Sequence, residues 1–413
     1  MDERAPAARI CCLDLDTFFV SAERLLDPLL EGKPVVVGAA PGQRGVVTAC
    51  SYEVRAFGVR SGMSTVEARK LAPHAIFLPT RHKAYTPYTK RVQEILERFT
   101  PEVRPASIDE FFLDFRGCEA LWANDTDANE DATIERTVRA MRVAIQVELG
   151  LPASAGVAAT RVVAKMASGQ AKPAGVRFVP VGSEHAFAAP LPVRRYPGIG
   201  PVAEAKLLAA EVHTLGQLLS LPPGELRARF GRLAASVRRG LDGRGGPQLG
   251  VDRPAFREHD PRGASEGSIS NERTFHADIG DLWRVADQLR ALAERVCWRA
   301  RQRGVRARTI TLKLRTADFR TITRARSGHP THREDRVFAC LLELLQGAWQ
   351  QQQPVRLLGV ALSNLRLDDG QLSLPLPARG RPVASSAIDA VRDRFGYDAI
   401  RLGAVGRPST WLA

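Results

Sequence analysis

The 413-residue sequence contains no long hydrophobic run, few cysteines and few aromatic residues. No stretch reaches the roughly 18–20 apolar residues that a membrane-spanning helix requires. Asp14 and Asp16 interrupt the apolar N-terminal run, which is not the pattern of a secretory signal peptide. We therefore expect a cytoplasmic protein with no membrane among its partners.

The six cysteines show neither the spacing nor the number of a disulfide framework. They lie at positions 11, 12, 50, 118, 297 and 340, with no C-x-x-C pair among them. We expect reduced and mostly buried thiols, as in other cytoplasmic proteins.

Acidic residues are outnumbered, and the net charge of +14 favours a polyanionic partner. Residues 181–250 contain 9 Lys/Arg and 5 Asp/Glu, and residues 251–366 contain 21 and 13. This concentration indicates a binding face for nucleic acid, with a membrane surface second and a merely solvated basic surface as the plain alternative.

The length and the hydrophobic fraction of 44% predict a globular α/β protein of two to four domains. Strands are expected at 9–16, 111–115 and 153–158, and a hairpin of two strands at 34–38 and 45–49 around Pro41-Gly42. Helices are expected at 17–30, 64–71, 84–98, 134–149 and 160–170. Residues 116–133 are expected to form a surface loop and 193–240 a helical region. A second α/β segment is expected at 267–275, 280–303, 307–315, 319–325, 332–350 and 355–365. A last amphipathic helix at 386–395 is expected to carry Ile388, Val391 and Phe395 on one face.

Two short apolar runs contain acidic residues that are costly to bury without a partner. They are Cys12–Phe19, which contains Asp14, and Ser107–Asp114, which contains Asp109 and Glu110. Neighbouring acids also repel each other, and Mg²⁺ removes both penalties because it selects hard oxygen ligands. The pattern predicts a two-metal site for in-line phosphoryl transfer. The alternative is that Asp109-Glu110 is a turn pair and Asp14 a structural acid.

A second set of residues is suited to a triphosphate. Tyr52, Arg55 and Lys172 supply a phenol and two cations that can neutralise and position the phosphates. Phe18 and Phe19 begin the helix after the first acid. We expect one ring to pack inward and the other to crowd the sugar of a bound nucleotide.

Two further segments are suited to a DNA backbone. In Pro197-Gly198-Ile199-Gly200-Pro201 the glycines allow backbone N–H groups to approach a DNA phosphate. The alternative is that this segment is only a turn between two helices. Residues 301–326 contain nine Arg/Lys and one Asp. Their period of two places Thr311, Lys313 and Arg315 on an outward face.

The chain resembles the Y-family translesion DNA polymerases, and most closely the bacterial DNA polymerase IV group. The matching motifs occur in order between about residues 9 and 376. They are D-L-D-T-F-F (14–19), S-Y-E-V-R-A-F-G-V-R-S-G-M (51–63), S-I-D-E (107–110), S-A-G-V-A (154–158), K-P-A-G (172–175), P-G-I-G (197–200), N-E-R-T-F (271–275) and Q-L-S-L-P-L (371–376).

The resemblance implies a right-hand polymerase fold with a C-terminal α/β little finger. The implied bounds are 1–16 and 80–180 for the palm, 17–79 for the fingers, 181–242 for a thumb with a helix-hairpin-helix, 243–262 for a linker, 263–366 for the little finger and 367–413 for a flexible tail with a clamp-binding motif and a short helix.

The resemblance also implies roles for individual residues. Asp14, Asp109 and Glu110 would bind two Mg²⁺ ions together with the carbonyl of Leu15. Phe19 would be the steric gate against ribonucleotides. The family often has Thr-Ala-Asn before the tyrosine, where this chain has Ala49-Cys50-Ser51.

The expected partners are primer-template DNA, dNTPs and a sliding clamp, bound by a monomer. The clamp-binding residues would be Gln371, Leu372, Leu374 and Leu376, because exposed leucines in a tail need a partner. A short strand finishing the little finger is the alternative.

Two other functions compete with that of an active, low-fidelity polymerase. A catalytically inactive adaptor that binds DNA or the clamp would not need the three acids and the triphosphate set. A two-metal nuclease would leave Phe19, Tyr52, Arg55 and Lys172 unexplained.

Overall fold

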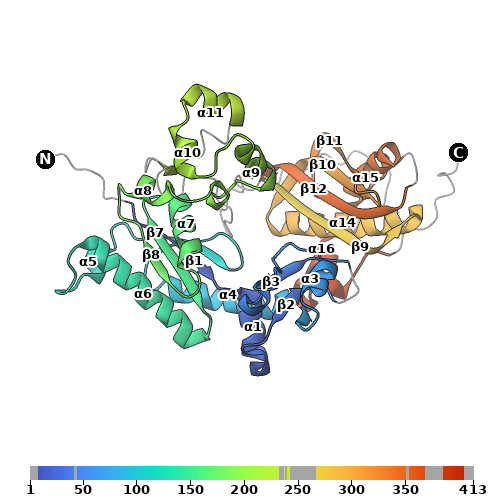
Figure 1. Cartoon of the computed structure of the whole chain (residues 1–413). Coiled ribbons are helices and arrows are strands. Elements are labelled where there is room, and N and C mark those ends of the chain that lie inside the picture. The colour runs from blue at the N-terminus through green and yellow to red at the C-terminus, as the bar shows by residue number, and fades with distance from the viewer. Residues whose placement is uncertain are drawn as a thin grey trace. The chain divides into compact units, whose positions relative to one another are not determined.

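The computed structural model describes residues 8–40, 44–231, 237, 240–241, 267–349, 353–367 and 385–403. The chain divides into two compact units, Met1–Phe256 and Arg257–Ala413. The elements of each unit are labelled in Figure 1. None of the described helices is both long and apolar enough to cross a bilayer.

The centre of the first unit is a five-stranded sheet with the order β5-β6-β1-β7-β8. Its strands are β5 (Glu102–Pro105), β6 (Glu110–Asp114), β1 (Ile10–Leu15), β7 (Ala153–Ala158) and β8 (Val176–Phe178). The middle strand β1 runs antiparallel to both β6 and β7. The three predicted strands of this sheet are therefore adjacent, whereas the short β5 and β8 were not predicted.

Helices cover both faces of this sheet. The odd-numbered β1 residues Cys11, Leu13 and Leu15 pack in one core with α4 (His82–Leu96) and α6 (Glu130–Leu149). The even-numbered Ile10 and Cys12 share another core with α7 (Arg161–Ala171). Because successive side chains of a strand point to opposite faces, both sides of β1 are buried.

A small sheet with the order β3-β2-β4 forms a separate core in the first unit. It contains β2 (Val35–Gly38), β3 (Val47–Cys50) and β4 (Ile76–Pro79), and it is accompanied by α1 (Phe18–Leu26), η1 (Pro28–Leu30), α2 (Tyr52–Arg55) and α3 (Thr65–Leu71). The antiparallel pairing of Val36 with Cys50 confirms the predicted hairpin. Sequence reasoning missed β4, which lies parallel to β2.

The region after residue 180 is helical, as predicted. Its elements are α8 (Glu184–Ala188), η2 (Val193–Arg195), α9 (Pro201–Leu208), α10 (Leu215–Ser220) and α11 (Pro223–Phe230). Thr214 and Gln217 form a capping box that fixes the start of α10.

The second unit contains an antiparallel sheet with the order β11-β10-β12-β9. Its elements are β9 (Ser268–Ile279), α14 (Leu282–Gln302), β10 (Val305–Thr316), β11 (Thr321–Thr331), α15 (Glu334–Ala348) and β12 (Val355–Leu367). Residues of both helices share one core with Leu312, Leu314, Leu358 and Val360 of the sheet. Each predicted element of this segment is present, with small shifts of its ends.

The segment predicted as a loop at 116–133 contains α5 (Glu119–Trp122) and the first turn of α6. Ion pairs hold this segment in place. The guanidinium of buried Arg9 donates to Glu119, Glu130 and Asp131 at 2.7–2.9 Å. The low apolar content suggested a loop, but ion pairs fix these residues instead.

The last predicted helix is present as α16 (Ser385–Phe395) and is followed by η3 (Tyr397–Ala399). Of the predicted apolar face, Ile388 and Val391 are half-buried and Phe395 is exposed. The buried residues of α16 are Asp389 and Arg392. Asp389 accepts from Arg301 of α14 at 2.6 Å, and Arg392 donates to Glu294 of α14 at 2.9 Å. This part of the predicted flexible tail therefore packs against α14.

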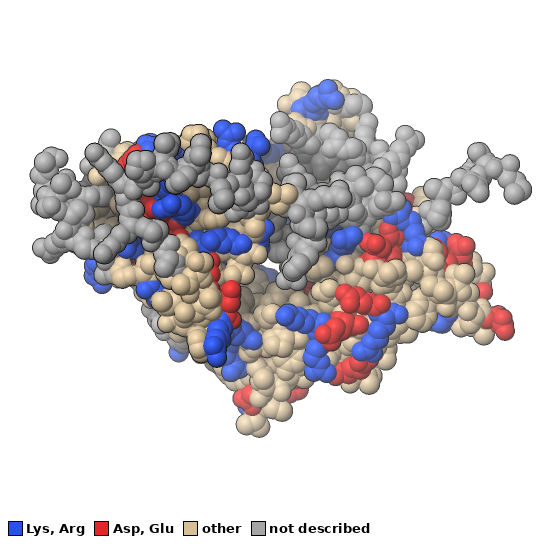
Figure 2. All heavy atoms as spheres, turned by 180° about the vertical axis from the view of Figure 1, so that it is seen from behind, with Lys and Arg blue, Asp and Glu red and all other residues tan. Residues whose placement is uncertain are grey.

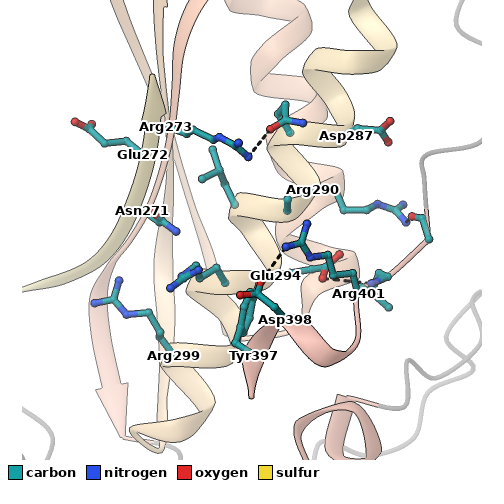
Figure 3. Close-up of a pocket in the computed structure, with 16 residues that line it drawn as sticks. Asn271, Glu272, Arg273, Asp287, Arg290, Glu294, Arg299, Tyr397, Asp398 and Arg401 are labelled. Carbon is teal, nitrogen blue, oxygen red and sulfur yellow. Dashed lines mark hydrogen bonds and ion pairs between the residues drawn. The ribbon is translucent and has the colours of Figure 1, made fainter. Parts of the chain in front are cut away.

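A pocket of about 700 Å³ lies between β9, α14 and the C-terminal segment (Figure 3). Its charged side chains have partners: Arg401 donates to Asp398 at 2.8 Å and Arg273 to Gln288 at 3.2 Å. Arg290 donates to the carbonyl of Gly403 at 3.2 Å. The contact of Arg290 attaches the C-terminal segment to α14.

Replacing Arg392 by Ala is expected to destabilise the second unit. The variant leaves Glu294 buried without its cation, which costs about 3–5 kcal/mol. Arg394→Ala on the same helix is the matched control because Arg394 is exposed, and it should change stability by less than about 0.5 kcal/mol. Denaturant unfolding of both variants makes the comparison, and equal stabilities would contradict the importance of the Arg392–Glu294 pair.

Candidate active site

The face of the central sheet toward α7 changes from apolar to polar at the end of β1. Asp14 pairs directly with Glu110 of β6 on one side and with Ser154 of β7 on the other. Residues that are opposite each other across strands share a face, so these polar side chains gather at one end of the sheet. Asp109 precedes Glu110, and its carbonyl accepts from the backbone N–H of Leu15 at 2.9 Å.

Gly156 determines how closely α7 approaches this face. A Cβ at this position would lie 2.1 Å from the backbone nitrogen of Ser168 and 2.2 Å from the carbonyl oxygen of Ala164. Only glycine permits this contact, which brings the lysines of α7 and of its C-terminal end over the carboxylates.

Two lysines bind the carboxylates of the site. Lys172 donates to Asp14 at 2.5 Å, and Lys165 donates to Glu110. The lysines are seven residues apart, or about two helical turns, so both lie on one side of α7 and its C-terminal end. They neutralise carboxylates that would otherwise repel each other.

Burial raises the pKa of Asp14, the cation of Lys172 opposes that shift, and the negative charges of Asp109 and Glu110 add to it. This is the electrostatic signature of acids that are crowded beside one another. Among the residues that the structure describes, no three His, Cys, Asp or Glu side chains already form a metal cage. The donor set of neighbouring carboxylates nevertheless fits a hard divalent cation, because such a cation offsets both burial and repulsion.

Tyr52 and Arg55 lie on α2 and face the same end of β1. The hydroxyl of Tyr52 is 3.4 Å from Asp16, and the guanidinium of Arg55 lies 4.7 Å from the centre of the Tyr52 ring. Burial and the charge of Asp16 raise the pKa of Tyr52 to about 12, so the phenol stays protonated and able to donate. Through Asp16, the structure brings Tyr52 close to Lys172 and Asp14.

The two phenylalanines differ as expected. Phe18 is buried in the core, whereas Phe19 is partly exposed and stacks on Tyr85 with ring centres 4.5 Å apart. The Tyr85 hydroxyl donates to the buried Glu23 at 2.5 Å, and Arg81 also pairs with Glu23. This network restricts movement of the Phe19 ring.

The glycine loop at 197–200 connects η2 with α9. Gly198 has φ +102°, a conformation that requires glycine, and Gly200 is the N-cap of α9. Pro201 occupies the first position of α9, where its fixed φ suits the helix and its missing N–H costs no hydrogen bond. The preceding helix is only a short 3₁₀ turn.

In the second unit, β10 has the predicted period of two. Ile310, Leu312 and Leu314 are buried, while Lys313 and Arg315 are partly exposed on the other face. Lys313 pairs with Glu272 at 2.6 Å, and Arg315 donates to Thr321 at 2.7 Å. On the side of the molecule in Figure 2, acidic and basic side chains are interspersed, so no single basic patch dominates the coloured surface there.

Two predicted segments lie outside the described residues. They are the linker at 243–262 and the clamp-binding residues Gln371, Leu372, Leu374 and Leu376.

Sequence reasoning did not assign Asp16, Ser154, Lys165 and Tyr85 to the site. The spacing of Asp16 from Asp14 and of Lys165 from Lys172 was a usable signal, because two residues of a strand and seven of a helix return to the same face. Ser154 and Tyr85 had no comparable signal.

Comparison with protein families gives two matches that together cover more than half of the chain. Residues 13–169 match the impB/mucB/samB family, and residues 266–375 match the C-terminal domain of that family.

Curated relatives match nearly the whole chain. A DNA polymerase IV of Dehalococcoides mccartyi (strain CBDB1) is 36% identical over 399 residues, which cover 96% of this chain and 97% of the relative. A DNA polymerase IV of Halorhodospira halophila is 37% identical over 359 residues, which cover 87% and 95%.

Solved structures share the fold. A Y-family DNA polymerase chimera of Dbh and Dpo4 superposes with a TM-score of 0.72 at 24% identity, covering 86% of this chain and 98% of that one. An insertion ternary complex of Dbh DNA polymerase gives a TM-score of 0.60 at 23% identity, covering 87% and 99%. The expected right-hand fold with a C-terminal sheet domain is confirmed.

Proposed function

The chain belongs to the impB/mucB/samB family of Y-family translesion DNA polymerases, and from this premise we propose how its own residues carry out template-directed DNA synthesis. The protein is a DNA-directed DNA polymerase that copies past damaged template bases. We propose that it binds primer-template DNA and transfers a nucleotide from a dNTP to the primer 3′-hydroxyl. The observation that carries the assignment is the register of Asp14 beside Glu110, with Asp109 adjacent and Lys172 on Asp14.

Polymerases of this family are metal-dependent. We propose that Asp14, Asp109 and Glu110, with the carbonyl of Leu15, hold two Mg²⁺ ions. When bound, the ions activate the attacking hydroxyl and neutralise the phosphates. Lys172 and Lys165 offset the charges of Asp14 and Glu110, while Asp109 accepts from the Ser107 hydroxyl. A bound divalent cation would take the place of Lys172 on Asp14. Lys172 is then available to a triphosphate.

Tyr52, Arg55 and Lys172 are proposed to bind the triphosphate. The protonated phenol and two cations match the charge of the phosphate oxygens and orient the leaving group. Phe19 is proposed as the gate against ribonucleotides, with its ring held by Tyr85. Phe18 is proposed as the second aromatic residue of the nucleotide site; its ring is buried, with its centre 5.6 Å from that of Phe19.

DNA binding is proposed for two surfaces. Gly198 and Gly200 lie at the N-terminus of α9, where backbone N–H groups are available to a phosphate. Lys313 and Arg315 lie on the outward face of β10 beside Gly359 and Leu357 of β12. Contacts of both kinds bind the phosphate backbone of DNA and do not depend on the base sequence. The affinity for DNA should therefore fall as the salt concentration rises.

We propose the same domain bounds that the sequence predicts. The palm comprises 1–16 and 80–180, the fingers 17–79, the thumb 181–242, the linker 243–262 and the little finger 263–366, with 367–413 beyond it. The separate core of the β3-β2-β4 sheet supports the fingers, and the four-stranded sheet supports the little finger.

We also propose a monomer that acts in the cytoplasm and docks on a sliding clamp through Gln371, Leu372, Leu374 and Leu376. All six cysteines are free and five are buried, which suits a reducing compartment. An inactive adaptor is not favoured, because the acids and the triphosphate set are both present.

Replacing Asp109 or Glu110 by Ala should abolish primer extension while leaving primer-template binding largely intact. Loss of a metal ligand should slow extension by about a thousandfold or more, whereas the phosphate contacts lie elsewhere. Extension with Mg²⁺ and four dNTPs measures the first effect and fluorescence anisotropy the second. Asp114→Asn on the same strand as Glu110 is the control. Near-normal extension by either Ala variant would disprove the metal assignment.

Phe19→Ala should admit ribonucleotides, because removal of the ring frees space for a 2′-hydroxyl. The measurement is the ratio of rNTP to dNTP incorporation efficiency in the variant and in the unmodified protein. Phe18→Leu is the comparison, since its buried ring should affect stability rather than this ratio. An unchanged ratio in Phe19→Ala would place the gate elsewhere.

Changing Gln371, Leu374 and Leu376 together to Ala should remove stimulation by the clamp and leave distributive synthesis intact. Burying two leucines is worth roughly 3–5 kcal/mol before ordering costs, so the contact mainly raises the local concentration of the polymerase. Extension with and without clamp tests this, and equal stimulation of both proteins would assign the segment a structural role.

A further inference from the structure

Asp16 is a buried acid next to the site that the metal and triphosphate roles do not use. It follows Asp14 by two residues, yet its side chain is 1% exposed where that of Asp14 is 25% exposed. A carboxylate this deeply buried requires strong hydrogen-bond partners.

Its partners come from three separate segments of the first unit. Asp16 accepts from the Ser154 hydroxyl of β7 at 2.8 Å and from the backbone N–H of Ala174, in the turn after α7, at 2.7 Å. The Tyr52 hydroxyl of α2 lies 3.4 Å away, and the Lys172 ammonium 3.7 Å away. One carboxylate therefore joins two of the three proposed triphosphate ligands to the central sheet.

The backbone around these contacts adopts a disfavoured conformation. Ala174 has φ +50° and Thr17, which follows Asp16, has φ +46°. Residues with a Cβ rarely adopt this region unless the surroundings fix them there, and such positions cluster at functional sites. The hydrogen bond from Ala174 to Asp16 is the contact that fixes the turn next to Lys172.

We propose that Asp16 is a positioning residue for the incoming nucleotide, holding Tyr52 and the Lys172–Ala174 turn in the geometry that receives the triphosphate. The inference rests on the proposed function of Tyr52 and Lys172. Asp16 is not a metal ligand, because its two oxygens are enclosed and already accept hydrogen bonds. It acts through its neighbours rather than by touching the substrate.

Asp16→Asn is the informative substitution. The amide keeps the size of the side chain and can still accept from Ser154 and Ala174. Its NH₂ group, however, neither accepts from Tyr52 nor attracts Lys172. Binding of a dNTP to a complex with dideoxy-terminated primer should weaken by about tenfold, while affinity for primer-template stays unchanged.

The same substitution is then made in a protein that carries Tyr52→Phe and Lys172→Ala. If Asp16 acts through these two residues, its loss should now weaken dNTP binding by less than about twofold. Ser154→Ala leaves Asp16 in place but removes one of its hydrogen bonds, and it should weaken dNTP binding by about threefold. This variant tests the inference if Asp16→Asn fails to fold.

Asp114→Asn, another buried carboxylate of the same sheet, is the control and should leave the dissociation constant for dNTP unchanged. Equal losses from Asp16→Asn in both backgrounds would overturn the inference, and so would lower thermal stability with unchanged dNTP binding. Failure of the unmodified protein to extend a primer would overturn the proposed function and this inference together. Normal extension with an unaffected Asp16→Asn variant would overturn the inference alone.

Discussion

Mutual repulsion among carboxylates at one end of the central sheet is the constraint on which the rest of the site depends. Asp14 and Glu110 are opposite each other across β1 and β6, with Asp109 adjacent, and burial makes their charges costlier still. Cations must compensate these charges. Lys172 and Lys165 do so in the structure, which requires α7 to lie close against the sheet.

That requirement explains several local features together. Gly156 lets the backbone of α7 approach β7, and Thr160 caps the start of the helix. The turn after Lys172 is tied back to the sheet by Asp16. Lys172, which offsets the charge of Asp14, is also a proposed triphosphate ligand, so one cation would serve both stability and the proposed nucleotide binding.

The C-terminal unit uses charge differently. Buried ion pairs of Arg301 with Asp389 and of Arg392 with Glu294 attach α16 to α14. Such ion pairs contribute little net stability compared with apolar contacts. Any packing that separates the two partners, however, leaves an unpaired charge buried, which is costly. They therefore specify where the segment docks.

The central strands, the hairpin and nearly every element of the second unit could be predicted from the sequence, because their apolar periodicity is strong. The short β4, β5 and β8 could not, since three or four residues give too little pattern and form only where a neighbouring strand offers its edge. The helix turn at 130–133 and the docking of α16 on α14 could not be predicted, for a common reason. Both are fixed by ion pairs, which a hydrophobic pattern does not reveal.

By itself, the sequence determined which chemical groups are available: acids within apolar strands, an aromatic pair after them, and a phenol with two cations at motif spacing. Only the tertiary structure decided what each group does. Asp14 and Asp16 stand in the same run, yet one stays accessible while the other is enclosed by Ser154, which is 138 residues away, and by the turn at Ala174. Burial and hydrogen bonding depend on segments that are distant along the chain, so local sequence could not separate the two acids.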